Sequence, residues 1–142
     1  GISRSLVALE KLRKQAGSVT RGNGSLLDDP SYRLKVAELE VELMATEFTE
    51  LRSLASAAAG AEPGPESSIL KLKGTEIQQR LQKLTVEAGG IYSAAWGATP
   101  VGHTFAHGGM SGYLASRAYT IYGGASEVQR DVIAKNVLGL KK

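Results

Sequence analysis

Two long segments of the sequence repeat apolar residues at alternating spacings of three and four, and this pattern restricts the fold more than any other feature. In the segment 30–59 the repeated residues are Leu34, Ala37, Val41, Met44, Phe48, Leu51, Ala55 and Ala58. In the segment 67–95 they are Leu70, Gly74, Ile77, Leu81, Leu84, Ala88, Ile91 and Ala95. This spacing is typical of helices that pack side by side at a small crossing angle. Each segment is therefore predicted to be a helix of about 30 residues, about 45 Å long, with its apolar stripe in the seam of a bundle.

The remaining segments also favour helices. The stretch GAEPGPE ends the first long pattern, since its prolines and glycines cannot continue a helix. Because this connection is short, the two long helices should be antiparallel. Shorter apolar patterns predict helices over about 2–16, 110–121 and 127–138, and no strand-like alternation of useful length is present. We therefore predict an all-α fold, an antiparallel up-and-down helical bundle.

The start of the first long helix has its own signals. Asp28 or Asp29 is predicted to cap this helix, with Pro30 in its first turn, where a missing N–H costs nothing. The charged residues of this helix fall outside the apolar stripe and are expected to face solvent; they are Arg33, Lys35, Glu38, Glu42, Glu47, Glu50 and Arg52.

Composition excludes several classes of function. The 142 residues include no cysteine, which rules out disulfides and thiolate sites and suits a reducing compartment such as the bacterial cytoplasm. The net charge is +3, and no block of lysine and arginine is dense enough for a nucleic-acid-binding arm. No apolar run approaches the roughly 18 to 20 residues of a membrane span. A helical domain with a core of its own is the expectation that remains.

The first residues of the chain lie within a helical pattern. The sequence starts at GISRSLVALEKL, without a methionine. An intact small protein more often begins with a frayed polar segment. We therefore expect residues 1–142 to be a single helical-bundle domain cut from a longer protein.

The stretch YGGASEVQ, residues 122–129, joins the last two predicted helices. Ser126 to Gln129 match the capping box, which predicts Ser126 as the N-cap of the last helix. One interpretation of the two glycines is a tight corner between helices. The other is a ligand site, because a helix start offers free N–H groups and glycines allow close approach of a phosphate or a ring. Glu127 would repel an anion directly above the turn, so a ligand should approach obliquely.

Other candidates carry weaker signals. Gly89 and Gly90 lie inside the third predicted helix and indicate close approach, either of another helix or of a ligand or partner subunit. The loop 96–112 holds His103 and His107, but its glycines argue against a helix that would align them, so surface histidines are expected rather than a metal site. The aromatic residues Trp96, Tyr92 and Phe105 are expected in the core, with a pocket lining as the alternative.

Four stretches together resemble one protein family. SRAYTIYGGASEVQRDVIAKNVLGL, residues 116–140, is closely similar to the C-terminal signature of acyl-CoA dehydrogenases. GISRSLVALEKLRKQ, DDPSYRLKVAELEVELMATEF and SSILKLKGTEIQQRLQKLTVEAGG follow that family's C-terminal helical domain in order. The last motif is specific, the earlier ones less so, and the likeness covers essentially the whole chain. The family's N-terminal helical domain and middle β domain are absent from these residues.

The resemblance implies a flavoprotein that oxidises the Cα–Cβ bond of an acyl-CoA thioester, as in fatty acid β-oxidation. In this family a carboxylate removes the α proton, N5 of FAD accepts the β hydride, and electrons pass to an electron-transfer flavoprotein. The C-terminal bundle also makes dimer and tetramer contacts. Its last turn and helix start touch FAD, including that of the neighbouring subunit.

Site residues follow from the resemblance position by position. Tyr122 matches the aromatic residue on the substrate side, and Gly123 stands where many members carry the catalytic Glu. Gly124, Ala125, Ser126 and Glu127 match the segment that lines the cofactor. No catalytic residue is therefore assigned, and no metal. Some members carry their base on an earlier helix, in a segment aligned just before Gly1.

Two further departures concern the cofactor. The family usually has an Arg and a Phe in the first inter-helix turn, whereas residues 13–30 contain no Phe and form a longer connection. A Gln that usually precedes the double glycine of the third helix is replaced around Val86. Three hypotheses follow for the function. The chain is the C-terminal domain of an acyl-CoA dehydrogenase that is inactive alone, or part of a non-catalytic subunit of a heteromeric dehydrogenase that serves oligomerisation. The third hypothesis is a helical interaction module without a ligand.

Overall fold

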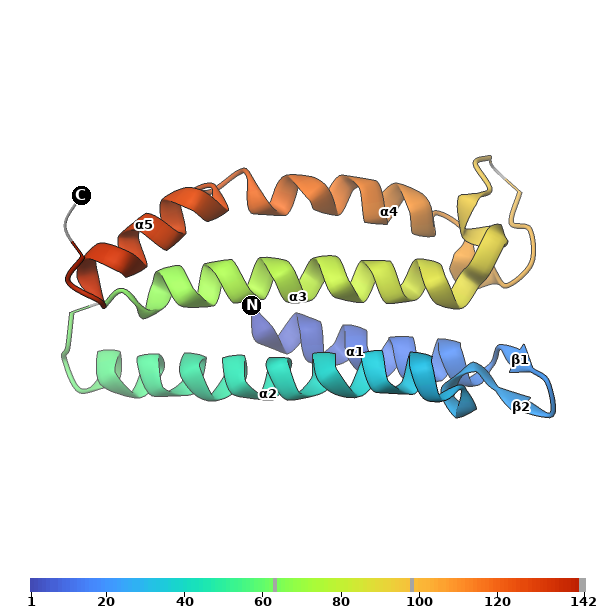
Figure 1. Cartoon of the computed structure of the whole chain (residues 1–142), viewed down its shortest axis with the longest axis horizontal. Coiled ribbons are helices and arrows are strands. Elements are labelled where there is room, and N and C mark those ends of the chain that lie inside the picture. The colour runs from blue at the N-terminus through green and yellow to red at the C-terminus, as the bar shows by residue number, and fades with distance from the viewer. Residues whose placement is uncertain (63, 98, 141–142) are drawn as a thin grey trace.

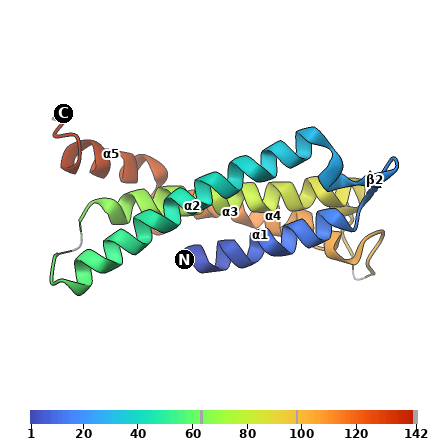
Figure 2. The ribbon, with the colours of Figure 1, turned by 90° about the horizontal axis from the view of Figure 1, so that it is seen from below.

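One central helix contacts all the other long helices of the protein. The computed structural model describes residues 1–62, 64–97 and 99–140. The described part contains five α-helices: α1 (Ile2–Gly17), α2 (Pro30–Ala58), α3 (Glu66–Gly89), α4 (Gly109–Ser116) and α5 (Ser126–Asn136). α3 lies between α1 and α2 on one side and α4 and α5 on the other (Figures 1 and 2). The predicted all-α bundle is confirmed, as is the antiparallel packing of α2 and α3 (Figure 1).

Short elements connect the helices. A hairpin of β1 (Thr20–Arg21) and β2 (Gly24–Ser25) follows α1, and the 3-10 helix η1 (Leu26–Asp28) leads into α2. Three more 3-10 helices follow α3, namely η2 (Gly90–Ala94), η3 (Thr104–Ala106) and η4 (Arg117–Thr120). The hairpin was not predicted, because strands of two residues are too short to show an alternation in sequence.

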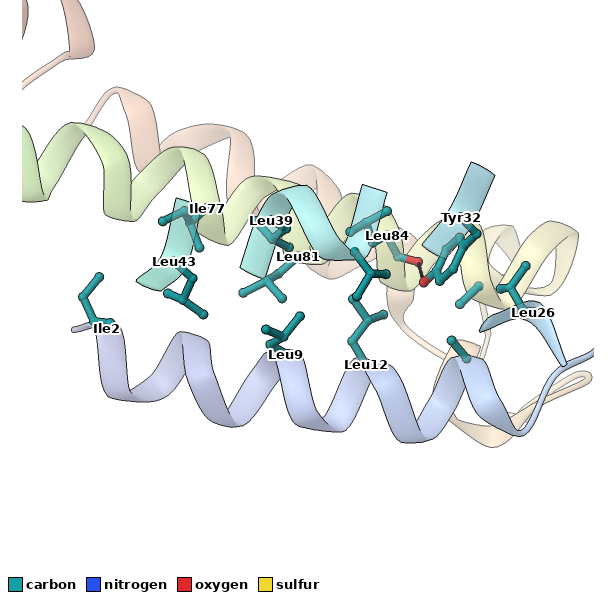
Figure 3. Close-up of a cluster of buried hydrophobic side chains, with 13 residues drawn as sticks. Ile2, Leu9, Leu12, Leu26, Tyr32, Leu39, Leu43, Ile77, Leu81 and Leu84 are labelled. Carbon is teal, nitrogen blue, oxygen red and sulfur yellow. Dashed lines mark hydrogen bonds between the residues drawn. The ribbon is translucent and has the colours of Figure 1, made fainter. Parts of the chain in front are cut away.

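The hydrophobic core lies where α1, α2 and α3 meet. Figure 3 shows side chains from the three helices pointing toward one another, among them Leu12, Leu39, Leu43 and Ile77, which are almost completely buried. Tyr32 closes one end of this core and donates a hydrogen bond of 2.9 Å from its hydroxyl to the Leu84 carbonyl. Burial, with a smaller contribution from the charge of Glu87, raises the pKa of Tyr32 well above its ordinary value. The core thus holds an uncharged, hydrogen-bonded tyrosine.

The predicted buried stripe of α2 is wrong, because the opposite face of this helix packs into the bundle. The eight residues from Leu34 to Ala58 that form the apolar stripe are all exposed. The buried residues of α2 are Tyr32, Val36, Leu39, Leu43 and Thr46. These five are also spaced by four and three, so α2 has two apolar faces of equal periodicity. The larger side chains of the inner face pack on α1 and α3.

One predicted surface residue of α2 also lies elsewhere. Glu42 is half-buried between α2 and α3, where it accepts hydrogen bonds from Lys73, at 2.9 Å, and from Arg80. The hydrogen bonds that Lys73 donates to Glu42 and Glu76 raise the pKa of its ammonium group. This cluster of charges ties the two long helices together beside the apolar core.

The start of α2 settles which aspartate caps it. Asp29 is the N-cap, and its carboxylate accepts from the backbone N–H groups of Ser31, at 2.9 Å, and Tyr32, at 3.1 Å. Asp28 instead accepts from the N–H of Ser25, at 2.7 Å, and from its hydroxyl, at 2.9 Å. Mainly the first of these bonds lowers the pKa of Asp28.

The third helix ends earlier than the pattern predicted. α3 stops at Gly89, and Gly90 adopts φ 57° and ψ −141°, a conformation that essentially only glycine can adopt. A Cβ on Gly89 would overlap the Ser93 hydroxyl and lie 2.7 Å from the Ala106 Cβ. Close approach at Gly89 is therefore explained by packing of η2 and η3 against α3. The stripe predicted to reach Ala95 ends with Ala88, and Ile91 is exposed.

The aromatic residues of η2 and of the segment after it lie in different environments. His103 stacks on Phe105, with ring centroids 5.3 Å apart, and Phe105 packs against the core. The expectation of a core position is wrong for Trp96, which is 76% exposed, and for Tyr92, which is also exposed. Within the described ranges, no cluster of three or more His, Cys, Asp or Glu side chains could hold a metal ion. In the same ranges, no helix has both the length and the hydropathy to cross a membrane.

Candidate functional site at the start of α5

The turn between η4 and α5 depends on two glycines. η4 ends at Thr120 and α5 begins at Ser126. Gly123 has φ 66° and Gly124 has φ 98°, values that L side chains rarely adopt. The chain can therefore reverse direction over a few residues and start a new helix. The helix predicted over about 110–121 is α-helical only to Ser116, because its last turn, η4, is a 3-10 helix that ends at Thr120.

Side chains of α3 hold this turn in place. The Lys71 ammonium donates to the carbonyl of Gly124, at 2.5 Å, and to that of Tyr119, at 3.2 Å. Further along α3, the Gln79 amide donates to the Ser116 carbonyl, at 3.0 Å, and to the Thr120 hydroxyl, at 3.3 Å. Sequence reasoning missed both residues, because their partners lie 37 to 53 positions away in the chain. Only the packing of η4 on α3 brings them together.

The predicted capping box is wrong. Ala125, not Ser126, is the N-cap of α5, and no side chain caps this helix start. Ser126 lies inside the helix and donates a long hydrogen bond of 3.4 Å to the Thr120 carbonyl. The Gln129 amide lies over Gly124, where it would overlap a Cβ at that position, instead of reaching back to the N-cap. The extended backbone of Ala125, at ψ 151°, lets the helix start one residue earlier than the motif predicts.

Because no side chain caps α5, backbone N–H groups in its first turn are available as hydrogen-bond donors. The backbone N–H of Gln129 donates a hydrogen bond of 3.0 Å to the carbonyl of the N-cap, Ala125, and is the first of α5 to do so. The N–H groups of the preceding first-turn residues have no capping side chain. They lie at the positive end of the helix dipole, next to a turn that presents little side-chain bulk. Such a site can donate hydrogen bonds to a carbonyl, a ring nitrogen or a phosphate.

The six residues assigned by resemblance lie in this one turn but differ in exposure. Tyr122, Gly123 and Glu127 are exposed, Gly124 and Ala125 are half-buried, and Ser126 is buried. The Tyr122 ring packs edge-on against Tyr119, with centroids 5.7 Å apart. A Cβ on Gly123 would meet nothing within 4 Å. The outer side of the turn is therefore an aromatic ring beside open backbone.

Two carboxylates of the described residues lie near the turn. Glu76 is the carboxylate that α3 places beside α5, and it pairs with Arg130 and Lys73 at 3.2 Å each. Glu127 is exposed on the first turn of α5. Gly123 has no side chain, so this position cannot abstract a proton from a ligand.

The other two regions that the resemblance links to a cofactor lie elsewhere. The connection between α1 and α2 and the end of α3 are at the opposite end of the bundle from α5 (Figure 1). There Val86 is half-buried, and its carbonyl accepts a hydrogen bond of 3.0 Å from the Ser93 hydroxyl. The regions that the resemblance links to a cofactor therefore lie near both ends of the described bundle (Figure 1).

Comparison with known proteins assigns the chain to a family. The family model described as "Acyl-CoA dehydrogenase, C-terminal domain" matches residues 2–138. The protein named acyl-CoA dehydrogenase IpdE1 of Mycolicibacterium smegmatis is 31% identical over 119 residues, which cover 81% of this chain and 27% of that protein. The chain thus spans roughly a quarter of the length of this relative.

Solved structures share the fold over the whole chain. A chain of the ChsE4-ChsE5 complex from Mycobacterium tuberculosis matches with a TM-score of 0.77 and 25% identity, covering 99% of this chain and 36% of that one. The FAD complex of PigA matches with a TM-score of 0.78 and 14% identity, over 99% of this chain and 34% of that one. At 14% identity the second likeness concerns the fold alone.

Proposed function

The chain belongs to the acyl-CoA dehydrogenase family, and we propose that it is the C-terminal helical domain of a longer FAD-dependent enzyme that desaturates an acyl-CoA thioester between its α and β carbons. The observation that carries the proposal is the match of the family's C-terminal model to nearly the whole chain. In a bacterium this enzyme would work in the cytoplasm and pass electrons to an electron-transfer flavoprotein. Bound FAD would supply the hydride acceptor for this reaction.

The turn before α5 fits one edge of a flavin cofactor. Its first-turn N–H groups are uncapped, and Gly124 and Ala125 leave the backbone accessible on one side. Ser126 takes part through its backbone, because its hydroxyl is already bonded to the Thr120 carbonyl. Glu127 is exposed and would repel a phosphate placed on the helix axis, so the turn suits a neutral polar edge. Lys71 keeps the Gly124 carbonyl turned toward α3, away from the cofactor side.

The substrate side of the turn has an aromatic wall and no base. Tyr122 is 59% exposed and would flank the acyl chain or thioester. At Gly123 the space that a side chain would occupy is open, so a longer acyl group could extend there. Position 123 therefore cannot supply the carboxylate that removes the α proton, and we place this base elsewhere in the full-length protein or on another subunit.

A visible absorption spectrum of the full-length protein tests this proposal. Bound FAD that bleaches when acyl-CoA is added anaerobically is the expected result. Replacing Gly124 with Val should lower FAD affinity, because its side chain would block the turn and its backbone conformation is strained. The matched control is Val137→Ala, at an exposed apolar position near the end of α5. Equal FAD binding by the Gly124→Val variant and the wild type would contradict the role assigned to this turn.

A second function is favoured by the glycine at position 123. A chain without the family's usual carboxylate can serve as the non-catalytic subunit of a heteromeric dehydrogenase, completing the site of a competent partner. One similar structure is a complex of two different proteins. The α1–α2 connection and the end of α3 lack residues that the family uses toward its cofactor, which also favours a chain that completes the site of a competent partner.

The two functions differ in what must be purified together. If this protein is catalytic, it should bind FAD and turn over substrate without any other polypeptide. If it is a partner subunit, it should be colourless alone and yield a yellow, active complex only when co-expressed with a second dehydrogenase chain. Gly123→Glu gives a further test, since activity gained by the isolated protein would place this turn beside the thioester. Unchanged activity with intact FAD binding would contradict that placement.

A further inference from the structure

One side chain of α3 contacts the turn before α5 on both sides of the turn. The Lys71 ammonium donates to the Tyr119 carbonyl, which precedes the two glycines, and to the carbonyl of the second glycine, Gly124. Lys71 is half-buried, and the start of α3 lies beside α5 (Figure 1). Hydrogen bonds from a charged donor are about twice as strong as those between neutral groups. Lys71 therefore fixes the direction of the Gly124 carbonyl more firmly than a neutral side chain would.

The helix start beside this contact is unfavourable on its local sequence. The N-cap of α5 is Ala125, and alanine is a poor N-cap residue, whereas glycine is a good one. If the helix began one residue earlier, Gly124 would be the N-cap and its carbonyl would accept from the Val128 N–H. Such a start would gain a backbone hydrogen bond and a better N-cap residue. The helix nevertheless begins at Ser126.

The Lys71 contact explains why the earlier start is not adopted. The carbonyl that would accept from Val128 is the one that Lys71 binds, at 2.5 Å, and it is turned toward α3. Within the described residues, no bond forms from the Val128 N–H to this carbonyl. Ala125 keeps an extended conformation instead, with ψ 151°. The position of the helix start thus depends on a side chain of another helix.

The same contact sets the direction of one backbone donor. In a planar trans peptide unit, the C=O and the N–H point in opposite directions. Because the Gly124 carbonyl points toward Lys71, the Ala125 N–H points away from α3, to the outer side of the turn. In the described part of the chain this N–H has neither a backbone acceptor nor a capping side chain. It is therefore available to a ligand on that side.

We propose that Lys71 is a positioning residue for the turn: it holds the start of α5 at Ser126 and thereby directs the Ala125 N–H to the side on which FAD is proposed to bind. A lysine suits this role, because its ammonium has three donors and can bind two carbonyls at once. The ammonium acts through the backbone and does not itself contact the ligand. The inference rests on the proposed function for the identity of the ligand, but not for the position of the helix start.

Residue-resolved hydrogen exchange of the full-length protein tests the effect on the helix start. In K71M the Gly124 carbonyl is released, so the Val128 N–H should bond to it and exchange about tenfold more slowly than in the wild type. The matched control is K73M, which removes from the same helix an ammonium that pairs with carboxylates of α2 and α3. It should leave Val128 exchange unchanged. A Val128 amide that exchanges in K71M at the wild-type rate, or faster because α5 unfolds, would overturn the proposal.

A proline substitution separates the helix start from the loss of the lysine. The residue before a proline is kept out of the α conformation, and proline is well tolerated at the first position of a helix. S126P should therefore hold Ala125 extended without Lys71. The double variant K71M/S126P should return the Val128 amide to the wild-type exchange rate, a recovery that a merely stabilising role of Lys71 does not predict. Slow exchange that persists in the double variant would contradict the role assigned to Lys71.

Cofactor affinity tests the consequence for the ligand. Full-length K71M should bind FAD about tenfold more weakly than the wild type, the loss expected when one hydrogen bond is not made. K73M should keep the wild-type dissociation constant. Equal FAD affinity of K71M and the wild type would overturn the positioning role. A wild-type protein that binds no FAD would instead contradict the proposed function, and the exchange measurement would still decide whether Lys71 sets the start of α5.

Discussion

Gly123 and Gly124 have similar backbone conformations but different surroundings. Both have positive φ, so any L side chain at either position is strained. A Cβ on Gly123 points into open space, whereas one on Gly124 meets the Gln129 amide. Backbone strain thus acts at both positions, and displacement of a neighbouring side chain only at the second. The sequence marked the pair as special, but only the structure separates the two effects.

Alanine substitutions can measure this strain against a matched helical glycine. Gly123→Ala and Gly124→Ala should each lower the free energy of unfolding by about 1–2 kcal/mol. Gly74→Ala, in the interior of α3 with nothing near its Cβ, should raise it by about 0.5–1 kcal/mol. Urea denaturation at neutral pH measures all three. Destabilisation by Gly74→Ala, or none by the other two, would contradict the described backbone.

Tyr32 predicts how stability changes at high pH. Its pKa in the folded protein is raised, chiefly by burial, above the value of about 10 that it has in an unfolded chain. The unfolded state therefore loses this proton first as pH rises. The stability contributed by the neutral tyrosine is fully present below about pH 10 and is lost progressively above it.

Comparison with phenylalanine isolates this effect. Tyr32→Phe removes the hydrogen bond to the Leu84 carbonyl and should cost about 1 kcal/mol at pH 7. Above about pH 10 the variant should lose less stability per pH unit than the wild type, because it has no phenol at this position to ionise. Denaturation curves between pH 7 and 11 measure the difference. Parallel loss of stability in both proteins would show that Tyr32 does not control the alkaline range.

At the scale of elements, α2 shows what periodicity can and cannot decide. The pattern correctly predicted a long helix that begins at Pro30 and ends before GAEPGPE. It could not decide which face lies inside, because two apolar sets with the same period occupy opposite sides. The choice depends on the side chains that α1 and α3 present, which lie far away in sequence. Residues such as Lys71 and Gln79 were missed for the same reason.

Neighbouring residues on the two faces of α2 test the orientation. Leu43 is completely buried and Met44 is 49% exposed, although they are adjacent in sequence. Leu43→Ala should lower the free energy of unfolding by about 2–5 kcal/mol, since it leaves a cavity in the core. Met44→Ala should change it by less than about 1 kcal/mol. Denaturation at protein concentrations low enough to keep the chain monomeric provides the measurement. Equal effects would mean that the two faces are not distinguished as described.

The whole molecule is built around α3, and its two sides are not equally well packed. The core cluster draws its buried residues from α1, η1, α2 and α3, whereas α5 has Ser126 as its buried residue. The family motif at 116–140 identified the protein from its sequence because that segment is distinctive, yet the segment contributes little to the core. The segment that carries the family signature and the residues that build the core therefore lie on opposite sides of α3.

This asymmetry predicts that α5 opens more readily than the rest of the bundle. Its attachment to α3 depends on polar contacts such as the Arg130–Glu76 pair and the bond from Lys71 to the Gly124 carbonyl. Exposed ion pairs and single hydrogen bonds contribute little compared with the buried leucines of α1 to α3. Local opening with a low free energy is common in segments that contact ligands.

Native-state hydrogen exchange measures this difference. The amides of Arg130 to Asn136 in α5 should exchange at least 100-fold faster than those of Leu39 to Leu43 in α2 and Ile77 to Leu84 in α3. In the full-length protein, addition of FAD should slow exchange in α5 more than in the core segments 39–43 and 77–84, because the proposed cofactor contact is the turn before α5. Exchange at one common rate across α2, α3 and α5 would show that the bundle opens only as a single unit.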